Sequence, residues 1–143
     1  STAEAKRYFR LCAVRRLEQS AHQLLEEARN AKLLQRETLI DQVKRYIDEH
    51  YAENWGLQDL ADRVAVSRSY LAKLFKEQTG MTIWSYCMKV RMSKAREMLL
   101  TTSLRSYEIG LRVGYGNSIH FSRIFKEYHG MNPMEYKEKF CGK

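Results

Sequence analysis

The sequence predicts an all-α protein: two helix-turn-helix subdomains joined by a long linker helix and preceded by a helix of coiled-coil character. Three observations support this fold class. The chain has one proline and seven glycines among 143 residues, and none of them falls within the first 55 residues. A Phe-Lys-Glu string followed by glycine, methionine and an aromatic residue occurs twice, in residues 75–86 and 125–136. Residues 82–101, between the two copies, keep helical apolar spacing without glycine or proline.

Residues 1–37 are predicted to form an N-terminal linker helix, since they are rich in Ala, Leu, Glu, Arg and Gln. Apolar residues recur there at alternating spacings of three and four, which are the a and d positions of a coiled coil. This apolar seam comprises Val14, Leu17, Ala21, Leu24, Ala28 and Ala31. It fits a helix packed against its own domain, and it also fits a homodimer through residues 10–35, which the small alanines would make weak.

A second helix is expected to begin at Thr38, because Thr38 with Asp41 three residues later resembles a capping box. Its apolar face would comprise Leu39, Ile40, Val43, Ile47 and Tyr51. Residues 54–56 would end this helix, and the first subdomain is expected to span residues 38–81.

Each subdomain contains two short helices around a tight turn. The turn is residues 65–67 in the first copy, which includes the cap position, and residues 114–116 before the cap in the second, so the second is one residue longer up to its cap. Ser67 and Asn117 are the predicted N-caps of the helices that follow. Two further positions match between the copies: a small residue where the helices approach (Ala61, Gly110) and a terminal glycine (Gly80, Gly130). This is the layout of a helix-turn-helix, and two copies in register make the signal specific.

The linker helix, residues 82–101, would be about 30 Å long, since an α-helix rises about 1.5 Å per residue. Successive major-groove faces of B-DNA lie about 34 Å apart. A rigid helix of this length could therefore hold two recognition helices in neighbouring grooves. The second subdomain is expected to span residues 102–143.

The charge distribution favours a polyanionic partner. The chain carries a net charge of +8. Residues 1–50 are nearly balanced, and the excess falls between Arg63 and Lys126, within the duplicated part. The three cysteines and four histidines show no metal-ligand spacing, so neither a metal nor a cofactor is expected. No apolar run reaches the length of about 20 residues that spans a bilayer, and we expect a cytoplasmic protein whose present residues make no membrane contact.

Three stretches resemble the AraC/XylS family of bacterial transcription regulators. They are "LADRVAVSRSYLAKLFKEQTG", "KVRMSKAREMLLTTS" and, most specifically, "VGYGNSIHFSRIFKEYHGMNPMEY". The resemblance covers Asp41 to about Phe140. It implies a double helix-turn-helix module that binds double-stranded promoter DNA, with RNA polymerase as a further candidate partner. The chain departs from the family pattern at Gly110 (usually alanine), Ile119 (often small and polar) and Lys137 (commonly arginine).

The leading segment resembles helical linkers that follow a phosphoacceptor receiver domain, or a membrane sensor segment, in related regulators. Neither a receiver nor a sensor is present in these 143 residues. The resemblance therefore implies the output end of a longer, signal-responsive regulator of the two-component type.

Helical periodicity and the resemblance select largely overlapping DNA-binding residues. With Leu71, Leu74 and Phe75, and Phe121, Ile124 and Phe125, assigned to the core, the other side of each recognition helix faces outward. The predicted DNA-binding residues are Arg68, Ser69, Ala72, Lys73 and Lys76 in the first copy, and Asn117, Ser118, Ile119, His120, Ser122, Arg123 and Lys126 in the second. The family's base-reading positions map onto Ser69, Ala72 and Lys73, and onto Ser118, Ile119 and Arg123.

Arg123 is the best candidate for direct readout, through two hydrogen bonds to guanine O6 and N7. The alternatives for Arg123 are a phosphate contact or a surface ion pair with Glu127 one turn later. Ile119 cannot hydrogen-bond a base and would contact a thymine methyl. Arg68, near the helix start, suits a phosphate. Trp84, Tyr86 and Tyr136 are assigned to the core rather than to base stacking.

Two other classes of function are disfavoured by the sequence. Some relatives fuse this module to a DNA-repair domain in which a cysteine accepts an alkyl group, but Cys12 lies in a plain amphipathic helix without clustered thiols. We therefore do not expect an enzyme. An adaptor that uses the N-terminal helix and has lost DNA binding is disfavoured by the basic faces of both predicted recognition helices.

Overall fold

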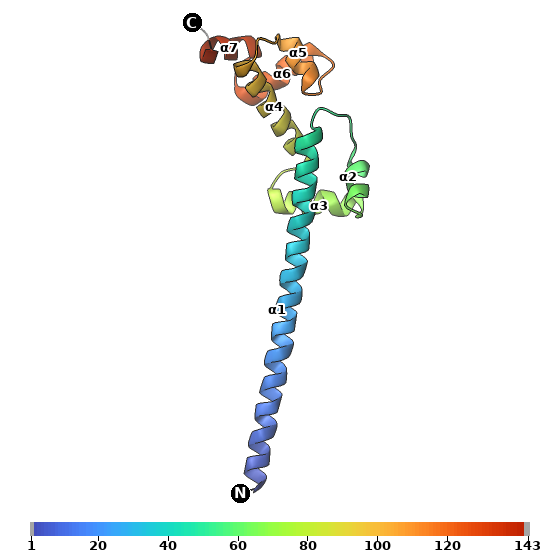
Figure 1. Cartoon of the computed structure of the whole chain (residues 1–143), viewed down its shortest axis with the longest axis vertical. Coiled ribbons are helices and arrows are strands. Elements are labelled where there is room, and N and C mark those ends of the chain that lie inside the picture. The colour runs from blue at the N-terminus through green and yellow to red at the C-terminus, as the bar shows by residue number, and fades with distance from the viewer. Residues whose placement is uncertain (1, 142–143) are drawn as a thin grey trace. The chain divides into compact units, whose positions relative to one another are not determined.

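The computed structural model describes residues 2–141, and this part of the chain is all-helical, as predicted (Figure 1). The helices are α1 (Thr2–His50), α2 (Leu57–Arg63), α3 (Arg68–Thr79), α4 (Ile83–Thr101), α5 (Ser106–Arg112), α6 (Ser118–His129) and α7 (Pro133–Cys141). The chain divides into two compact units, one up to Leu39 and the other from Ile40 onward. No helix within residues 2–141 is both long enough and apolar enough to span a membrane.

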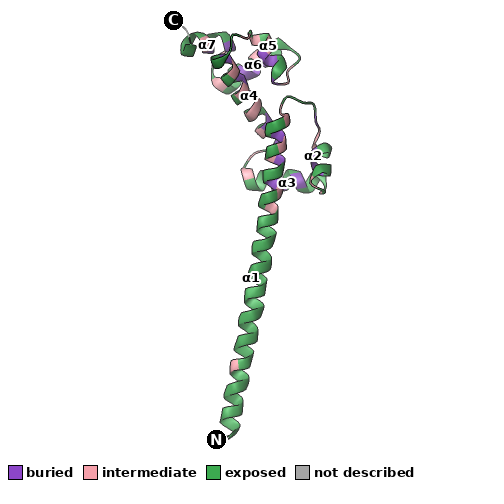
Figure 2. Ribbon diagram, viewed as in Figure 1, coloured by how far each residue is buried: buried purple, intermediate pink, exposed green. Residues whose placement is uncertain are grey.

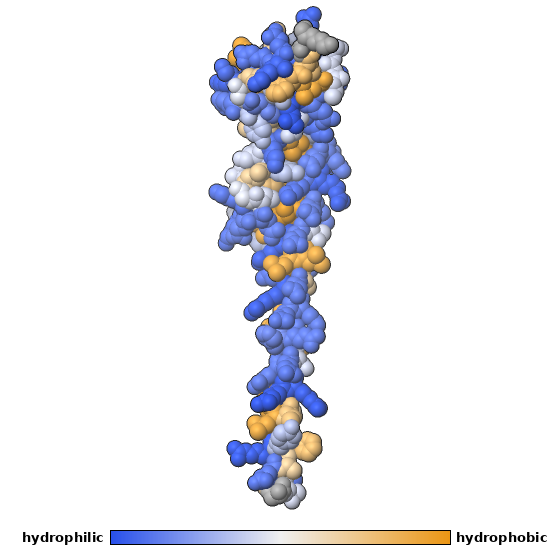
Figure 3. Space-filling model, turned by 90° about the vertical axis from the view of Figure 1, so that its left-hand side faces the viewer, coloured by the Kyte–Doolittle hydropathy of each residue, from blue (hydrophilic) through white to orange (hydrophobic). Residues whose placement is uncertain are grey.

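The first unit consists of the part of α1 up to Leu39, and nearly all of its residues are exposed (Figure 2). The apolar seam is among them: Val14, Leu17 and Leu24 are 49%, 71% and 65% exposed. Figure 3 shows apolar patches interrupted by hydrophilic side chains along this helix.

The predicted helix restart at Thr38 is wrong, because α1 continues without a break to His50. The Thr38 hydroxyl donates a hydrogen bond to the carbonyl of Leu34 at 2.8 Å, within the same helix. A threonine that bonds the carbonyl four residues back sits inside a helix, whereas a capping threonine accepts a bond from an amide ahead of it.

The second unit holds two copies of a larger repeat than the sequence indicated. Its first copy opens with the end of α1, which buries Ile40, Val43 and Ile47. Its second opens with the end of α4, which buries Met92, Ala95 and Leu99 at the same spacing. A helix-turn-helix pair follows each, α2–α3 or α5–α6, and then a closing helix, which is the start of α4 or α7. Helix α4 thus closes the first copy and opens the second.

The closing helices make the same aromatic contact in both copies. Phe75 meets Tyr86 edge to face, with ring centroids 5.6 Å apart, and Phe125 meets Tyr136 in the same way at 5.6 Å. Edge-to-face geometry is favourable because the positive ring edge approaches the negative ring face. The core assignment of Tyr136 is correct, since it is 9% exposed, whereas that of Trp84 is wrong, since it is 54% exposed.

The predicted caps are confirmed. The Ser67 side chain accepts a hydrogen bond from the Tyr70 amide at 3.1 Å. The Asn117 side chain accepts from the amides of Ile119 and His120 at 2.9 and 3.1 Å. Gly80 and Gly130 end α3 and α6 in the left-handed conformation, with φ of 77° and 84°, which glycine adopts without steric cost.

Gly110, one of the departures from the family pattern, has a packing reason. A Cβ atom added there would lie 3.0 Å from the Cγ and Cδ2 atoms of the Phe121 ring. Both residues are fully or nearly fully buried. The equivalent residues of the first copy are Ala61 and Leu71, so the smaller residue of the second copy matches its larger aromatic partner.

Candidate nucleic-acid interface

The recognition helices α3 and α6 each bury one face and expose the other. Leu71, Leu74 and Phe75, and Phe121, Ile124 and Phe125, are buried as predicted. The predicted DNA-binding residues are all exposed, except Ser122, which is half-buried. Ile119 is 81% exposed, an unusual degree of exposure for a large apolar side chain. The geometry therefore leaves every predicted contact residue accessible to a ligand.

Arg123 is ordered by its own helix rather than by an acidic neighbour. Its Nη2 atom donates to Nδ1 of His120 at 3.0 Å, one turn earlier. The His120 ring in turn meets the Tyr115 ring edge to face, with centroids 5.7 Å apart. The ion pair between Arg123 and Glu127, one of the alternatives that the sequence leaves open, is not among the ion pairs within residues 2–141. One bond to His120 leaves the other guanidinium donors available for a base or a phosphate.

A hollow of about 320 Å³ lies beside the first recognition helix. Lys73 and Lys76 of α3 line it, together with apolar residues of α2 and α4. Trp84 forms part of its wall and stacks on the buried Trp55, with ring centroids 5.1 Å apart and planes at 10°. The stacking holds Trp84 at the surface, beside the two lysines.

The second copy has a hollow of about 570 Å³ in the equivalent place, and its lining is more polar. Where the first has Leu57, Ala72 and Trp84, the second has Ser106, Ser122 and Met134. It also includes Ser118, Arg105 and Lys137. Sequence reasoning omitted Arg105 because it precedes α6 by more than ten residues. An alignment of the two complete copies, in which a leucine is replaced by Ser106, would have pointed to this polar wall.

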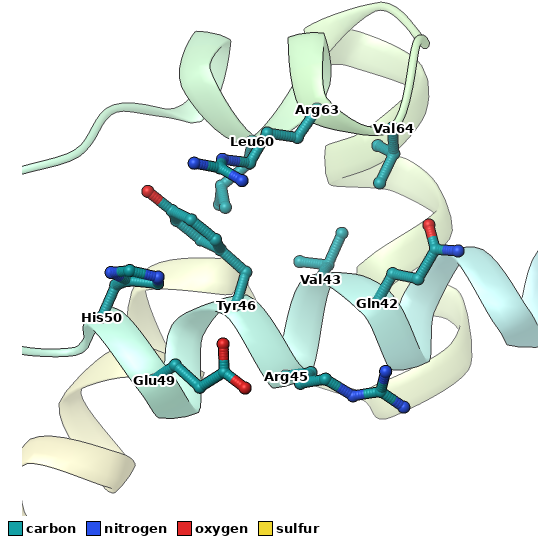
Figure 4. Close-up of a pocket in the computed structure, with 9 residues that line it drawn as sticks. All are labelled: Gln42, Val43, Arg45, Tyr46, Glu49, His50, Leu60, Arg63 and Val64. Carbon is teal, nitrogen blue, oxygen red and sulfur yellow. The ribbon is translucent and has the colours of Figure 1, made fainter.

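A third hollow, of about 250 Å³, lies between the end of α1 and α2 and contains no recognition-helix residue (Figure 4). The guanidinium of Arg63 lies 4.2 Å from the centre of the Tyr46 ring. Tyr46 in turn stacks on His50, with centroids 4.4 Å apart. This arrangement attaches α2 to α1 through a cation–π contact and gives Arg63 a role in packing.

No group of three or more His, Cys, Asp or Glu residues that could hold a metal ion occurs among residues 2–141. Cys12, Cys87 and Cys141 are all free thiols. The chemistry of the exposed recognition faces is therefore that of hydrogen-bond donors, cationic groups and one apolar side chain.

Comparison with known proteins identifies the same fold. The helix-turn-helix domain family matches residues 60–139. The arabinose operon regulatory protein of Escherichia coli K12 is 30% identical over 132 residues, which cover 92% of this chain and 45% of that protein. This chain therefore spans less than half the length of that relative.

Two solved structures extend the comparison. The C-terminal domain of AraT, a response regulator from Geobacillus stearothermophilus, has a TM-score of 0.68 and 33% identity, covering 71% of this chain and 84% of that chain. The DNA-binding domain of AdpA, solved in complex with a target DNA, has a TM-score of 0.67 and 23% identity, covering 71% and 91%. At that identity the second likeness shows the fold alone.

Proposed function

Because this chain belongs to the AraC/XylS family of transcription regulators, we propose that its second unit binds double-stranded DNA sequence-specifically, with α3 and α6 in successive major grooves. The observation that carries the proposal is the pair of exposed recognition faces on either side of α4. Helix α4 has 19 residues and is therefore about 28 Å long. This length is close to the distance of about 34 Å between successive major-groove faces.

The charges of the second unit support the same partner. Lysine and arginine side chains are exposed on both recognition faces, at Lys73, Lys76, Arg123 and Lys126. A basic surface supplies affinity for phosphates without regard to sequence, and base-edge contacts supply the specificity. We assign base readout to Arg123 and Lys73, an apolar thymine contact to Ile119, and backbone contacts to Lys76 and Lys126.

The proposal extends to the longer protein. The chain spans 45% of its arabinose-regulator relative, and AraT, whose C-terminal domain it resembles, is a response regulator. We propose that this chain is the output part of a signal-responsive regulator that acts on promoter DNA in the bacterial cytoplasm, alongside RNA polymerase. A sensor or receiver domain would precede residue 1.

The exposed seam of α1 supports a homodimer through residues 10–35. Leu17 and Leu24 lie seven residues apart, which places them on one side of a coiled-coil helix, and both are more than 60% exposed. Pairing of two chains would raise the effective concentration of the second DNA-binding module at a tandem site.

Footprinting on a duplex selected from a random pool tests the DNA-binding proposal. Protection should cover about two helical turns on one face of the duplex. A gel shift at several salt concentrations separates specific from non-specific binding, because phosphate contacts weaken steeply with salt. If no sequence were preferred at any salt concentration, the proposal would fail in favour of a protein adaptor. Protection of a single groove segment would mean that only one recognition helix engages.

A further inference from the structure

The segment that follows α1 is held by a side chain from the middle of α4. Arg91 donates from Nε to the carbonyl oxygen of Tyr51 at 2.6 Å and from Nη2 to the carbonyl oxygen of Glu53 at 3.3 Å. The thiol of Cys87, one turn earlier, lies 3.8 Å from the same Tyr51 oxygen. Both carbonyls lie just after His50, the last residue of α1, where the chain leaves the helix, and the guanidinium supplies a donor to each of them.

Arg91 also contacts the turn of the second helix-turn-helix. Its guanidinium carbon lies 5.2 Å from the centre of the Tyr115 ring. Burial raises the pKa of the Tyr115 hydroxyl, and Arg91 acts in the opposite direction. Tyr115 also packs against Phe121, with ring centroids 5.9 Å apart. A single side chain thus connects the segment after α1 to the turn that precedes the second recognition helix.

The backbones of Ala52 and Gly114 lie so close together that no side chain would fit between them. Gly114 has φ of 101°, a conformation that L side chains rarely adopt. A Cβ atom there would lie 2.9 Å from the Ala52 carbonyl oxygen and 3.1 Å from the guanidinium carbon of Arg91. Tyr51 packs against the apolar core of the second copy. We name Tyr51, Glu53, Arg91, Gly114 and Tyr115 together the inter-repeat joint.

The first copy has nothing equivalent to this joint. The residue that corresponds to Gly114 is Ala65, with φ of 55°, and the residue that corresponds to Tyr115 is Val66. Both turns make the same internal bond, from Val66 to Ala61 at 3.1 Å and from Tyr115 to Gly110 at 2.8 Å. The turn itself therefore does not need the tyrosine ring, and a separate role must account for it.

We propose that Arg91 is a positioning residue that fixes the distance and rotation between α3 and α6, and so determines which spacing of two DNA segments the protein accepts. The proposal rests on the proposed function, in which both recognition helices engage one duplex. Helix α4 is the covalent connection between the two copies, and the inter-repeat joint adds a second connection beside it. Without that second connection, the copies can pivot about the middle of α4.

The geometry makes spacing a sensitive readout. One base pair adds about 3.4 Å along the duplex axis and about 35° of rotation, since a turn has about 10.5 base pairs. To follow a one-base-pair change, the two copies must therefore shift by about 3.4 Å and twist by about 35° relative to each other. A joint that fixes both the distance and the rotation between the copies resists such a change.

The test uses the full chain and the duplex selected as its preferred site. One base pair is inserted or deleted between the two protected segments, and the affinity is measured at fixed salt for the wild type and three variants. Arg91→Ala removes the joint, Arg91→Lys keeps the charge but loses the fork, and Arg96→Ala removes an exposed charge elsewhere on α4. Thermal unfolding of each variant checks that the fold is retained.

For the wild type, insertion or deletion should reduce affinity at least about tenfold, the cost of losing the base contacts of one segment. For Arg91→Ala the same change should cost less than about threefold, and Arg91→Lys should fall between the two. Arg96→Ala should bind more weakly at every spacing and keep the wild-type ratio. This ratio isolates geometry, because a purely structural or electrostatic loss weakens binding at all spacings alike.

The outcomes distinguish the two proposals. If the wild type shows the penalty and Arg91→Ala shows an equal one, the role of Arg91 is overturned while the proposed function stands. If the wild type tolerates any spacing, the engagement of two grooves fails, and the role of Arg91 fails with it. If Arg91→Ala does not fold, the ratio for Arg91→Lys and Tyr115→Leu decides: an unchanged ratio in both refutes the proposal, and a reduced ratio supports it.

Discussion

Gly110→Ala should destabilise the second unit, although the same change in a free helix would be stabilising. Replacing a helical glycine with alanine gains about 1 kcal/mol from helix propensity. Here the new methyl carbon would lie 3.0 Å from two atoms of the Phe121 ring and 3.2 Å from its Cβ atom. Overpacking of this kind costs about 1–3 kcal/mol, and Phe121 is fully buried. We therefore expect a net loss of up to about 2 kcal/mol in the free energy of unfolding.

The first copy supplies the compensating change. Its equivalent pair is Ala61 and Leu71, both of which are completely buried. Phe121→Leu alone should cost about 1–2 kcal/mol by leaving a cavity. The double variant, Gly110→Ala with Phe121→Leu, recreates the pair of the first copy and should be more stable than the sum of the single losses predicts. Gly116→Ala, outside the helices and where an added Cβ meets nothing within 4 Å, is the control for a methyl group added without overpacking.

Urea unfolding of the four proteins and the control gives the coupling free energy directly. Distant sites are additive within about 0.5 kcal/mol, so a favourable coupling above that value supports the packing argument. Two results would refute it. One is a free energy of unfolding that Gly110→Ala raises by the full propensity gain, and the other is strict additivity of the two substitutions.

Three further predictions follow from the structure. Arg123→Ala should cost about 1–3 kcal/mol of binding free energy and relax the preference at one base pair, whereas Lys76→Ala should weaken all sequences alike; equal losses of Arg123→Ala on specific and random duplexes would make it a phosphate contact. Leu17→Glu with Leu24→Glu should abolish cooperative binding to a two-site duplex and leave single-site affinity unchanged, as measured by gel shift; equal weakening on a single site would contradict a coiled-coil dimer. Burial, together with the hydrogen bond to the Asp48 carboxylate and the charge of that carboxylate, raises the pKa of Tyr86 from 10.0 to about 12. The contribution of the neutral Tyr86 hydroxyl to stability should therefore be complete below pH 10 and disappear between pH 10 and 12. Tyr86→Phe should remove that step from the profile of stability against alkaline pH.

Elements governed by local chemistry were predictable from the sequence. The caps at Ser67 and Asn117 and the terminal glycines depend on residues within one turn of the chain, and the buried faces of α3 and α6 follow from helical periodicity. Thr38 was misassigned because threonine offers its hydroxyl either to a helix start or to the carbonyl four residues back. The sequence does not show which of the two bonds forms. The periodicity also identified which residues of α3 and α6 are exposed, and their contacts with DNA stay predictions.

The inter-repeat joint was not predictable from local pattern. Arg91 bonds to carbonyls 38 and 40 residues earlier, and a backbone carbonyl leaves no trace in residue identity. The repeated opening helix was missed for another reason. Ile40, Val43 and Ile47 share only a spacing with Met92, Ala95 and Leu99, and not residue types. Comparing the two copies by apolar spacing over their whole length would have revealed it.

The two recognition helices should prefer different bases, so the binding site should be an asymmetric pair of segments bound in one orientation. The internal contacts of the two copies agree, down to the edge-to-face pairs at 5.6 Å. The exposed faces agree less: Ser69 corresponds to Ile119 and Ala72 to Ser122. Lys73 with Arg123, and Lys76 with Lys126, are cations in both copies, and of these pairs only the first is assigned to base readout.

An isoleucine suits a thymine methyl, and a serine suits a hydrogen-bonding base edge. The two segments selected from a random pool should accordingly share at most the base contacted by the cation. Exchanging the two segments while keeping their spacing should lower affinity by the cost of several mismatches, about 1–3 kcal/mol each. The selected site could instead be a direct repeat of one sequence, or the exchange could have no effect. Either result would mean that the scaffold shared by the two copies, rather than the exposed faces, determines what each helix contacts.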